Sequence, residues 1–315
     1  MDKIICVVGP TASGKTAMAV ELAKRYNGEV LSCDSMQLYR HMDIGTAKPT
    51  TEEMEGIPHH MIDVLEPDEV FSVGRYVEMA EPILQDILAR GKTCVICGGT
   101  GLYVDSLIAG RTFAPYPETG RRQELEALAE EKGIEAVIAL LREFDPVSAE
   151  TLHPGNKRRI IRAAEVYLET GKTITQHNLE TQAVPPKYEP VWLGLDFTHR
   201  AELYARIDRR VDLMMEQGLL QEIENLLARG VPASATSLQA IGYKEPMAAL
   251  RGEMTMEQAV EKIKQESRRY AKRQLTWFRR NKQIHWLFRE EKTGFEPIWE
   301  NARQILSGFD SIFGG

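Results

Sequence analysis

The sequence contains no apolar run that approaches the ~20 residues needed to cross a membrane as a helix. It shows no secretory leader either, because the apolar run Ile4–Val8 is typical of a core strand and follows the first methionine almost directly. We therefore expect a cytoplasmic protein. The formal net charge of -7 argues against a chain whose whole surface binds nucleic acid.

Cysteine is scarce, and its spacing excludes a zinc site. All the cysteines lie in or beside apolar runs: Cys6, Cys33, Cys94 and Cys97. The last two have C-x-x-C spacing, but no second pair or histidine partner completes a zinc pattern. A redox pair is the alternative to reduced, buried, small apolar side chains, and we favour the latter. The adjacent His59 and His60 cannot chelate one ion well, so they indicate a surface loop.

The most informative segment that is present runs from Gly9 to Thr16. It follows the strand-like run and precedes a helix-like segment, which is the context of a phosphate-binding loop, G-x-x-x-x-G-K-T. A chance match is the alternative, and the flanking elements argue against it. We expect a bound phosphorylated compound to contact Gly9, Pro10, Thr11, Ala12, Ser13, Gly14, Lys15 and Thr16, with the Thr16 hydroxyl also on Mg²⁺.

One residue that usually accompanies this loop is missing. Hydrolases and motors built on it have an apolar strand that ends in a metal-binding aspartate. Here the strand at residues 93–97 runs into Gly98-Gly99-Thr100-Gly101 instead. This absence argues against an ATP-driven machine and leaves a kinase or another transferase that acts on a phosphorylated donor.

Strand-like and helix-like segments alternate through the first third of the chain. We expect strands at residues 4–8, 29–32 and 93–97 and helices at 17–26 and 73–90. This alternation is typical of an α/β fold, here a P-loop NTPase-like parallel sheet flanked by helices. Ligands of such folds bind at the carboxyl ends of the strands, so we expect the loop, Asp34 and Thr100 to share one cleft.

A helical insertion interrupts this core. Pro115-Tyr116-Pro117 marks a break, and a second break at 185–190 precedes a strand at 191–195. We therefore expect a core domain of residues 1–115 and 189–315 and an insertion domain of residues 116–188. Its helices are expected at 118–132, 134–144 and 156–170. The core then continues with helices at 200–217, 220–229 and 255–281, and a strand at 284–288.

The last long helix is strongly basic between residues 262 and 282, where Glu266 is the only acidic residue. Tyr270, Trp277 and Phe278 interleave with its positive charges. A phosphate backbone with unpaired bases is one natural partner; a lopsided solvated face is the alternative. A second basic cluster, from Lys157 to Arg162, lies at the start of a helix. Positive charge there opposes the helix dipole, so the cluster indicates a bound ligand rather than a merely solvated surface.

Several motifs follow one another along the chain: Gly9–Thr16, Asp34–Tyr39, Gly98–Tyr103, Arg158–Ala163, Arg206–Leu219, Ala240–Lys244 and Lys272–Trp277. Together they resemble the bacterial tRNA dimethylallyltransferases over essentially the whole chain. The phosphate loop alone is unspecific, but the full set is highly specific. Related enzymes that prenylate free adenine nucleotides lack the tRNA-binding segments, so the resemblance favours tRNA.

The resemblance implies that a dimethylallyl group moves from dimethylallyl diphosphate to the exocyclic N6 amine of adenosine 37 in tRNA. Diphosphate is released and Mg²⁺ is required. The partner would be the anticodon stem-loop; we expect no membrane partner and a monomer. Expected tRNA-binding residues are Asp34, Ser35, Met36, Gln37, Arg158, Arg159, Ile160, Ile161, Arg162, Gly242, Tyr243, Lys244, Lys272, Arg273, Gln274 and Trp277.

The chemistry of this reaction suggests roles for six residues. The exocyclic amine must lose a proton as it attacks, and Asp34 is the candidate general base. Negative charge builds on the leaving diphosphate, so Lys15, Arg210 and the Mg²⁺ on Thr16 would stabilise it. Thr100 would bind the amine or position the diphosphate, and Gln37 is suited to reading a neighbouring base.

Other interpretations remain open for each residue. Asp34 is alternatively a turn aspartate, Thr100 a helix cap, and Trp277 a core residue. Arg206 and Arg209 compete with Arg210, which is alternatively a surface residue. For the whole chain, the alternatives are a nucleoside or small-molecule kinase that uses ATP at the same loop, and an RNA-binding switch gated by nucleotide.

Overall fold

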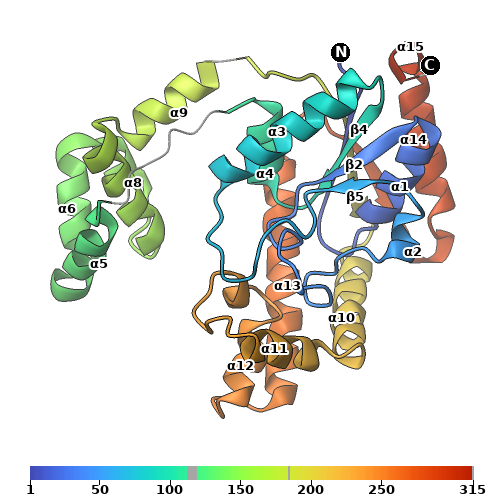
Figure 1. Ribbon diagram of the computed structural model, residues 1–315. Helices are drawn as coiled ribbons and strands as arrows, with labels where there is room; N and C mark the ends of the chain where they lie inside the picture. The colour runs from blue at the N-terminus through green and yellow to red at the C-terminus, as the bar shows by residue number, and fades with distance from the viewer. Residues whose placement is uncertain (112–118, 184, 314–315) are drawn as a thin grey trace. The chain divides into compact units, whose positions relative to one another are not determined.

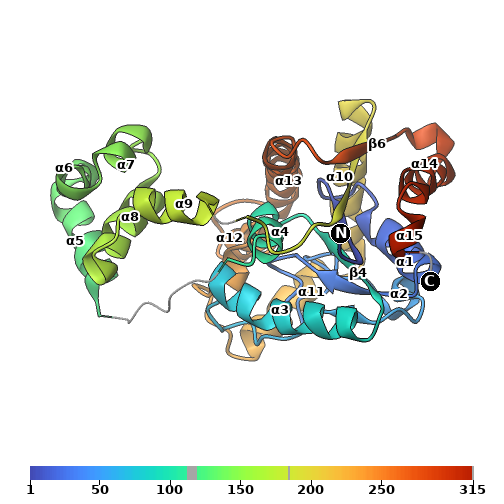
Figure 2. The ribbon, with the colours of Figure 1, turned by 90° about the horizontal axis from the view of Figure 1, so that it is seen from above.

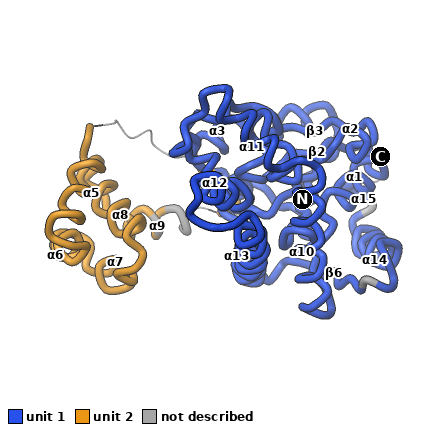
Figure 3. Tube along the Cα trace, turned by 90° about the horizontal axis from the view of Figure 1, so that it is seen from below, with its two compact units in different colours: residues 1–110, 187–315 blue, residues 111–186 orange. Residues whose placement is uncertain are grey.

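The computed structural model describes residues 1–111, 119–183 and 185–313. Within it the chain forms two compact units, residues 1–110 with 187–315, and residues 111–186 (Figures 1 and 3). The insertion was expected to begin at residue 116, within Pro115-Tyr116-Pro117, and that position lies outside the described residues. No helix among the described residues has the length and apolarity to cross a membrane.

The first unit is built on a six-stranded sheet in the order β3-β2-β4-β1-β5-β6, and all its strand pairs are parallel. The strands are β1 (Ile4–Val8), β2 (Gly28–Ser32), β3 (His59–His60), β4 (Thr93–Gly98), β5 (Val191–Phe197) and β6 (His285–Arg289). Every residue of β1, β2 and β5 is buried, as expected for parallel strands covered on both faces. The expected parallel α/β fold is confirmed.

Helices cover both faces of this sheet (Figures 1 and 2). The helices of this unit are α1 (Lys15–Arg25), α2 (Thr51–Met54), α3 (Val73–Ala89), α4 (Gly101–Ile108), α10 (Arg200–Glu216), α11 (Leu219–Ala228), α12 (Lys244–Leu250), α13 (Met256–Phe278), α14 (Glu296–Ser307) and α15 (Asp310–Phe313). In Figure 1, α3 and α4 lie on one side of the sheet and α1 and α14 on the other. Apolar side chains of α1 and α14 form one core with those of β1 and β5.

Local sequence explains where the long helices begin. The Thr255 hydroxyl accepts a hydrogen bond from the Gln258 amide at 3.2 Å, and the Gln258 side chain accepts one from the Thr255 amide at 2.9 Å. This is a capping box, and α13 begins at Met256, the residue after the cap Thr255. Ser72 caps α3 in the same way, by accepting from the Arg75 amide at 3.2 Å.

The expected surface loop at His59 and His60 is wrong, because these residues form the edge strand β3 beside Val30 and Leu31. A two-residue strand is too short to show a periodic pattern in the sequence. Its neighbour Glu29 on β2 is a buried carboxylate that accepts a hydrogen bond from His60 Nε2 at 2.8 Å. Arg90 (2.5 Å) and Lys92 (2.6 Å) also donate to it, and Arg90, the largest effect, holds its pKa far below the usual range.

The second unit is helical and has its own core. Its helices are α5 (Arg121–Lys132), α6 (Ile134–Phe144), α7 (Pro146–Thr151), α8 (Lys157–Thr170) and α9 (Ile174–Ala183). Leu125, Val137, Leu141 and Ile160 are among the apolar residues that bury one another between these helices. The unit therefore packs as a small bundle in its own right.

Candidate active site

The phosphate loop lies between β1 and α1, and its glycines are required by the backbone. Gly9 has φ of 145°, and a Cβ there would lie 2.4 Å from the Leu195 carbonyl oxygen on β5. Gly14 has φ of 96° and precedes the first residue of α1. Only glycine adopts these angles at little cost, so both positions fit the close wrapping that a phosphate requires.

Lys15 is the charged residue of the loop. Its Nζ donates a hydrogen bond of 2.7 Å to the Pro10 carbonyl, folding the side chain back over the loop. Burial lowers the pKa of Lys15 to about 8, and Arg210 lowers it further, while Cys97 and Asp34 act in the opposite direction. The ammonium group is therefore poorly solvated, and a bound anion would favour its charged form.

Arginines from distant parts of the chain surround the loop. On α10, Arg206 Nε donates to the Ala12 carbonyl at 3.2 Å, and Arg210 Nη1 donates to the Thr11 hydroxyl at 3.4 Å. Burial, then the neighbouring Arg206, lowers the pKa of Arg210. Arg209, which was the other alternative to Arg210 on α10, is exposed.

Another arginine at the loop, Arg289 at the end of β6, was not predicted from the sequence. Its Nη1 lies 3.0 Å from the point where a Cβ on Gly14 would stand. Nothing in the local sequence distinguishes Arg289 from other exposed arginines, because only the parallel pairing of β5 with β6 brings it to the loop.

Asp34 follows β2 and closes a turn. Its Oδ1 accepts hydrogen bonds from the amides of Met36 at 2.8 Å and Gln37 at 3.3 Å. Among the described residues, none donates a hydrogen bond to Oδ2. Asp34 is thus a turn aspartate through one oxygen, and the carboxylate still lines the cavity described below.

Thr100 is the residue before α4, but its side chain does not cap that helix. Instead its Oγ1 accepts from the Ser35 amide at 3.1 Å. Thr100 therefore occupies the N-cap position of α4, but its hydroxyl is bonded to the turn that begins at Asp34 and not to the helix.

Gln274 connects the phosphate loop with the turn after β4. Its Oε1 accepts from the Thr11 amide at 2.9 Å, and its Nε2 donates to the Gly99 carbonyl at 3.0 Å. A Cβ on Gly99 would lie 2.1 Å from that nitrogen. The side chain, which the sequence suggested for tRNA, is buried and both ends of its amide are bonded within the protein.

Trp277 is half-buried against α4. Its Nε1 donates to Asp105 Oδ2 at 2.8 Å, and a Cβ on Gly101 would lie 2.1 Å from its ring. The Arg280 guanidinium lies 3.9 Å from the ring centroid. The tryptophan therefore has a structural role in packing α13 on α4, with one ring face covered by arginine.

These elements enclose a cavity of about 690 Å³. Many of the predicted site residues line this cavity: Thr11, Ala12, Gly14, Lys15 and Thr16 of the phosphate loop, and Asp34, Ser35, Met36 and Gln37. Arg210, Gly242, Tyr243, Arg273 and Gln274 also line it, whereas Thr100, Lys244, Lys272 and Trp277 do not. The cavity thus brings the phosphate loop and Asp34 together, and Thr100 is linked to it through the Ser35 amide.

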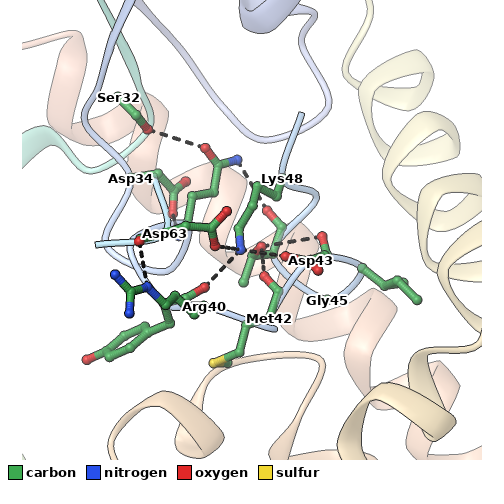
Figure 4. Close-up of polar contacts among 12 residues, drawn as sticks. Ser32, Asp34, Arg40, Met42, Asp43, Gly45, Lys48 and Asp63 are labelled. Carbon is green, nitrogen blue, oxygen red and sulfur yellow. Dashed lines mark hydrogen bonds and ion pairs between the residues drawn. The ribbon is translucent and has the colours of Figure 1, made fainter. Parts of the chain in front are cut away.

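The segment after Asp34 is held by buried polar groups (Figure 4). Lys48, with only 5% of its side chain exposed, donates to the Tyr39 carbonyl at 2.8 Å and to Asp43 and Asp63 at 2.5 Å each. The Gln37 Nε2 donates to the Ala47 carbonyl at 3.1 Å. The chain from Asp34 to Lys48 is therefore a tight loop rather than a loose surface excursion.

Part of the positive charge of α13 is used inside the protein. Arg268 donates to Asp208 on α10 at 2.5 and 2.7 Å, and Lys264 lies 2.7 Å from Asp212. Lys272 and Arg273 are exposed, and no carboxylate of the described residues forms an ion pair with them. The usable charge of the helix is therefore smaller than its composition suggests.

Other residues expected at tRNA divide into exposed and buried groups. Arg158 and Arg159 are exposed at the start of α8. Arg162 is paired with Glu165 at 2.7 Å. Ile160 and Ile161 are buried in the core of the second unit, so their side chains serve packing.

A divalent cation would find few protein ligands here. Among the described residues, no group of three or more histidine, cysteine, aspartate or glutamate side chains could hold one. The Thr16 hydroxyl lines the cavity. One hydroxyl beside a diphosphate suits Mg²⁺, which is usually held by one or two protein ligands together with substrate phosphates.

Comparisons with known proteins agree with this geometry. The family model described as IPP transferase matches residues 37–281, and that of isopentenyl transferase matches residues 2–67. The tRNA dimethylallyltransferase of Caldanaerobacter subterraneus subsp. tengcongensis is 47% identical over 97% of this chain and 98% of its own. That of Acetivibrio thermocellus is 46% identical over 98% and 99%.

Solved structures give the same result. The full-length tRNA isopentenylpyrophosphate transferase from Bacillus halodurans is 42% identical over 100% of both chains, with a TM-score of 0.72. A eukaryotic dimethylallyltransferase acting on tRNA is 30% identical over 99% of this chain and 80% of its own, with a TM-score of 0.84.

Proposed function

The chain belongs to the tRNA dimethylallyltransferase family, whose members prenylate an adenosine of tRNA, and we propose that it acts on the N6 amine of adenosine 37. The donor is dimethylallyl diphosphate, and diphosphate is the leaving group. One observation carries this proposal: a single cavity joins a cation-rich phosphate loop to a carboxylate, Asp34.

The donor's diphosphate lies on the phosphate loop. The half-buried Lys15 and Arg210 face the negative charge that develops as the allylic carbon–oxygen bond breaks. Bound Mg²⁺ supplies Lewis-acid stabilisation of the same charge, and Thr16 is the residue that would hold it. Arg206 is bonded to the loop through Ala12 and supports the loop's shape.

Asp34 removes the proton from the acceptor amine. Its Oδ1 is fixed by the turn to Met36 and Gln37, which leaves Oδ2 to accept the proton. Thr100 is a positioning residue, because its hydroxyl accepts a hydrogen bond from the amide of Ser35, which directly follows the general base Asp34. Gln37 contacts a neighbouring base of the anticodon loop.

The tRNA contacts both units. Lys272, Arg273 and Lys244 of the first unit and Arg158, Arg159 and Arg162 of the second provide positive charge for its phosphates. Contact with tRNA by the helical insertion is supported by the exposure of Arg158 and Arg159 at a helix N-terminus, where packing does not require them.

The deciding experiment supplies the purified protein with dimethylallyl diphosphate, Mg²⁺ and an unmodified tRNA with adenosine at position 37, without ATP. We expect prenylated tRNA and one diphosphate per prenyl group. In a parallel reaction that contains ATP, phosphate transfer from ATP without prenyl transfer would instead establish the kinase alternative.

A further inference from the structure

Glu222 on α11 joins two segments that line the cavity. Its carboxylate accepts hydrogen bonds from the successive amides of Asp43, Ile44 and Gly45 at 2.8, 2.8 and 3.2 Å. It also accepts one from the Tyr243 hydroxyl at 2.7 Å. All these groups are donors, so the pocket around Glu222 suits a charged carboxylate and nothing else of its size.

The same two segments also meet by direct packing. A Cβ on Gly45 would lie 2.5 Å from the Tyr243 ring, so the backbone at Gly45 packs closely against the phenol end of that side chain. Tyr243 has no exposed surface. Burial raises the pKa of its phenol strongly, and Glu222 raises it further, so it remains a hydrogen-bond donor to Glu222.

The contacts around Glu222 extend to Gln37 through the backbone. Gly45, Thr46 and Ala47 line the cavity. The Gln37 side chain donates to the carbonyls of Thr46 at 3.4 Å and Ala47 at 3.1 Å. The orientation of the Gln37 amide therefore depends on the position of this segment, which Glu222 fixes.

We propose that Glu222 is a positioning residue that sets base selection at the acceptor end of the cavity. It holds residues 43–47 against Tyr243 and so orients the amide of Gln37. This inference rests on the proposed function, because Gln37 has there been assigned to the anticodon loop. The hydrogen bonds of Glu222 go to residues 43–45 and to Tyr243 and not to the phosphate loop, so donor binding should not depend on Glu222.

The test compares Glu222→Gln, Gln37→Ala and the double variant in the full-length protein. Each is assayed with an anticodon stem-loop and with stem-loops in which either neighbour of the target adenosine is replaced. The measured quantity is the discrimination between these acceptors, as the ratio of their kcat/KM values. Glu224→Gln, an exposed change on the same helix, is the matched control.

We expect Glu222→Gln to reduce discrimination about tenfold, the effect of losing charge-assisted hydrogen bonds at one carboxylate. Gln37→Ala should have the same effect, and the double variant should lose no more than either single variant. The KM for dimethylallyl diphosphate should stay within about twofold of wild type, because the phosphate loop is untouched. Glu224→Gln should match wild type in every measurement.

Additive losses in the double variant would overturn the proposal, as would wild-type discrimination in Glu222→Gln or an equal rise in the donor's KM. If Glu222→Gln does not fold, Tyr243→Phe removes one of the four hydrogen bonds and keeps the ring. It should then reduce discrimination about threefold, again without adding to Gln37→Ala. A wild-type protein that prenylates no acceptor refutes the proposed function instead, because the ratios are then undefined.

Discussion

Lys15 makes donor binding depend on pH in a way that can be calculated. Its pKa of about 8 in the ligand-free protein means that roughly nine-tenths of the molecules carry the charge at pH 7 and one-tenth at pH 9. If the diphosphate binds the charged form, its affinity should fall about tenfold between these two values. The donor's own phosphates titrate near pH 6, so they are already about nine-tenths ionised at pH 7 and change little between pH 7 and 9.

Calorimetry gives a second and stricter measurement of the same effect. Titration of dimethylallyl diphosphate and Mg²⁺ into the protein without tRNA, in buffers of different ionisation enthalpy, measures protons taken up on binding. We expect about 0.9 proton per donor at pH 9 and about 0.1 at pH 7, because binding restores the charge on Lys15.

Two variants assign the proton to Lys15. Lys15→Arg keeps its charge throughout this range, so it should bind without proton uptake at pH 9. Lys24→Met changes an exposed lysine of the same helix, which is bonded to Glu21 and Glu55, and should behave like wild type. Proton uptake that persists in Lys15→Arg, or a wild-type affinity that is constant from pH 7 to 9, would refute the reasoning.

Further predictions concern the base, the basic helix and the sheet. Asp34→Asn should bind tRNA normally but lower kcat at least a hundredfold, as loss of a general base does, and a near-normal single-turnover rate would remove it from that role. Reversing the charges of Lys272 and Arg273 should flatten the slope of log affinity for tRNA against log salt by about 1.5, whereas an unchanged slope would mean that they bind no phosphate. Glu29→Gln should lower the free energy of unfolding by about 2 kcal/mol at pH 7, because Arg90 and its neighbours lose their buried partner. The pKa of Glu29 is lowered on folding, so its contribution to the free energy of unfolding is complete above about pH 4.3 and is lost as the pH falls below that. In urea unfolding experiments, the difference in stability between wild type and Glu29→Gln should therefore be far larger at pH 7 than at pH 3.

Much of the first unit could be predicted from the sequence, because the patterns that specify its elements each lie within one short segment. The phosphate loop needs its glycines and lysine in one short segment, and the strands around it are continuous apolar runs. The capping box at Thr255 likewise lies within four residues. In each case the physical cause and the sequence pattern occupy the same stretch of chain.

The residues that hold the site together could not be predicted, because their partners are far away in the sequence. Gln274 looked like one more polar residue of a basic helix, yet its amide joins the phosphate loop to the turn after β4. Glu222 showed no motif at all, since its partners are backbone amides that any residue could supply. Burial also changed the meaning of Tyr243, which the sequence suggested as a contact for tRNA.

The distribution of charge around the cavity distinguishes between two uses of a phosphate loop, prenyl transfer from a diphosphate and reactions of ATP. Lys15, Arg206 and Arg210 gather on the loop side, and the carboxylate of Asp34 closes a separate turn after β2. A displacement that leaves negative charge on a diphosphate and removes a proton from an amine needs cations and a base at opposite ends of the reacting atoms. A hydrolase or motor at the same loop would also need an acidic residue to hold the metal at the end of the neighbouring strand, and β4 ends instead in Gly98. The arrangement of these charges therefore favours prenyl transfer, and the pH dependence of Lys15 tests its cationic half.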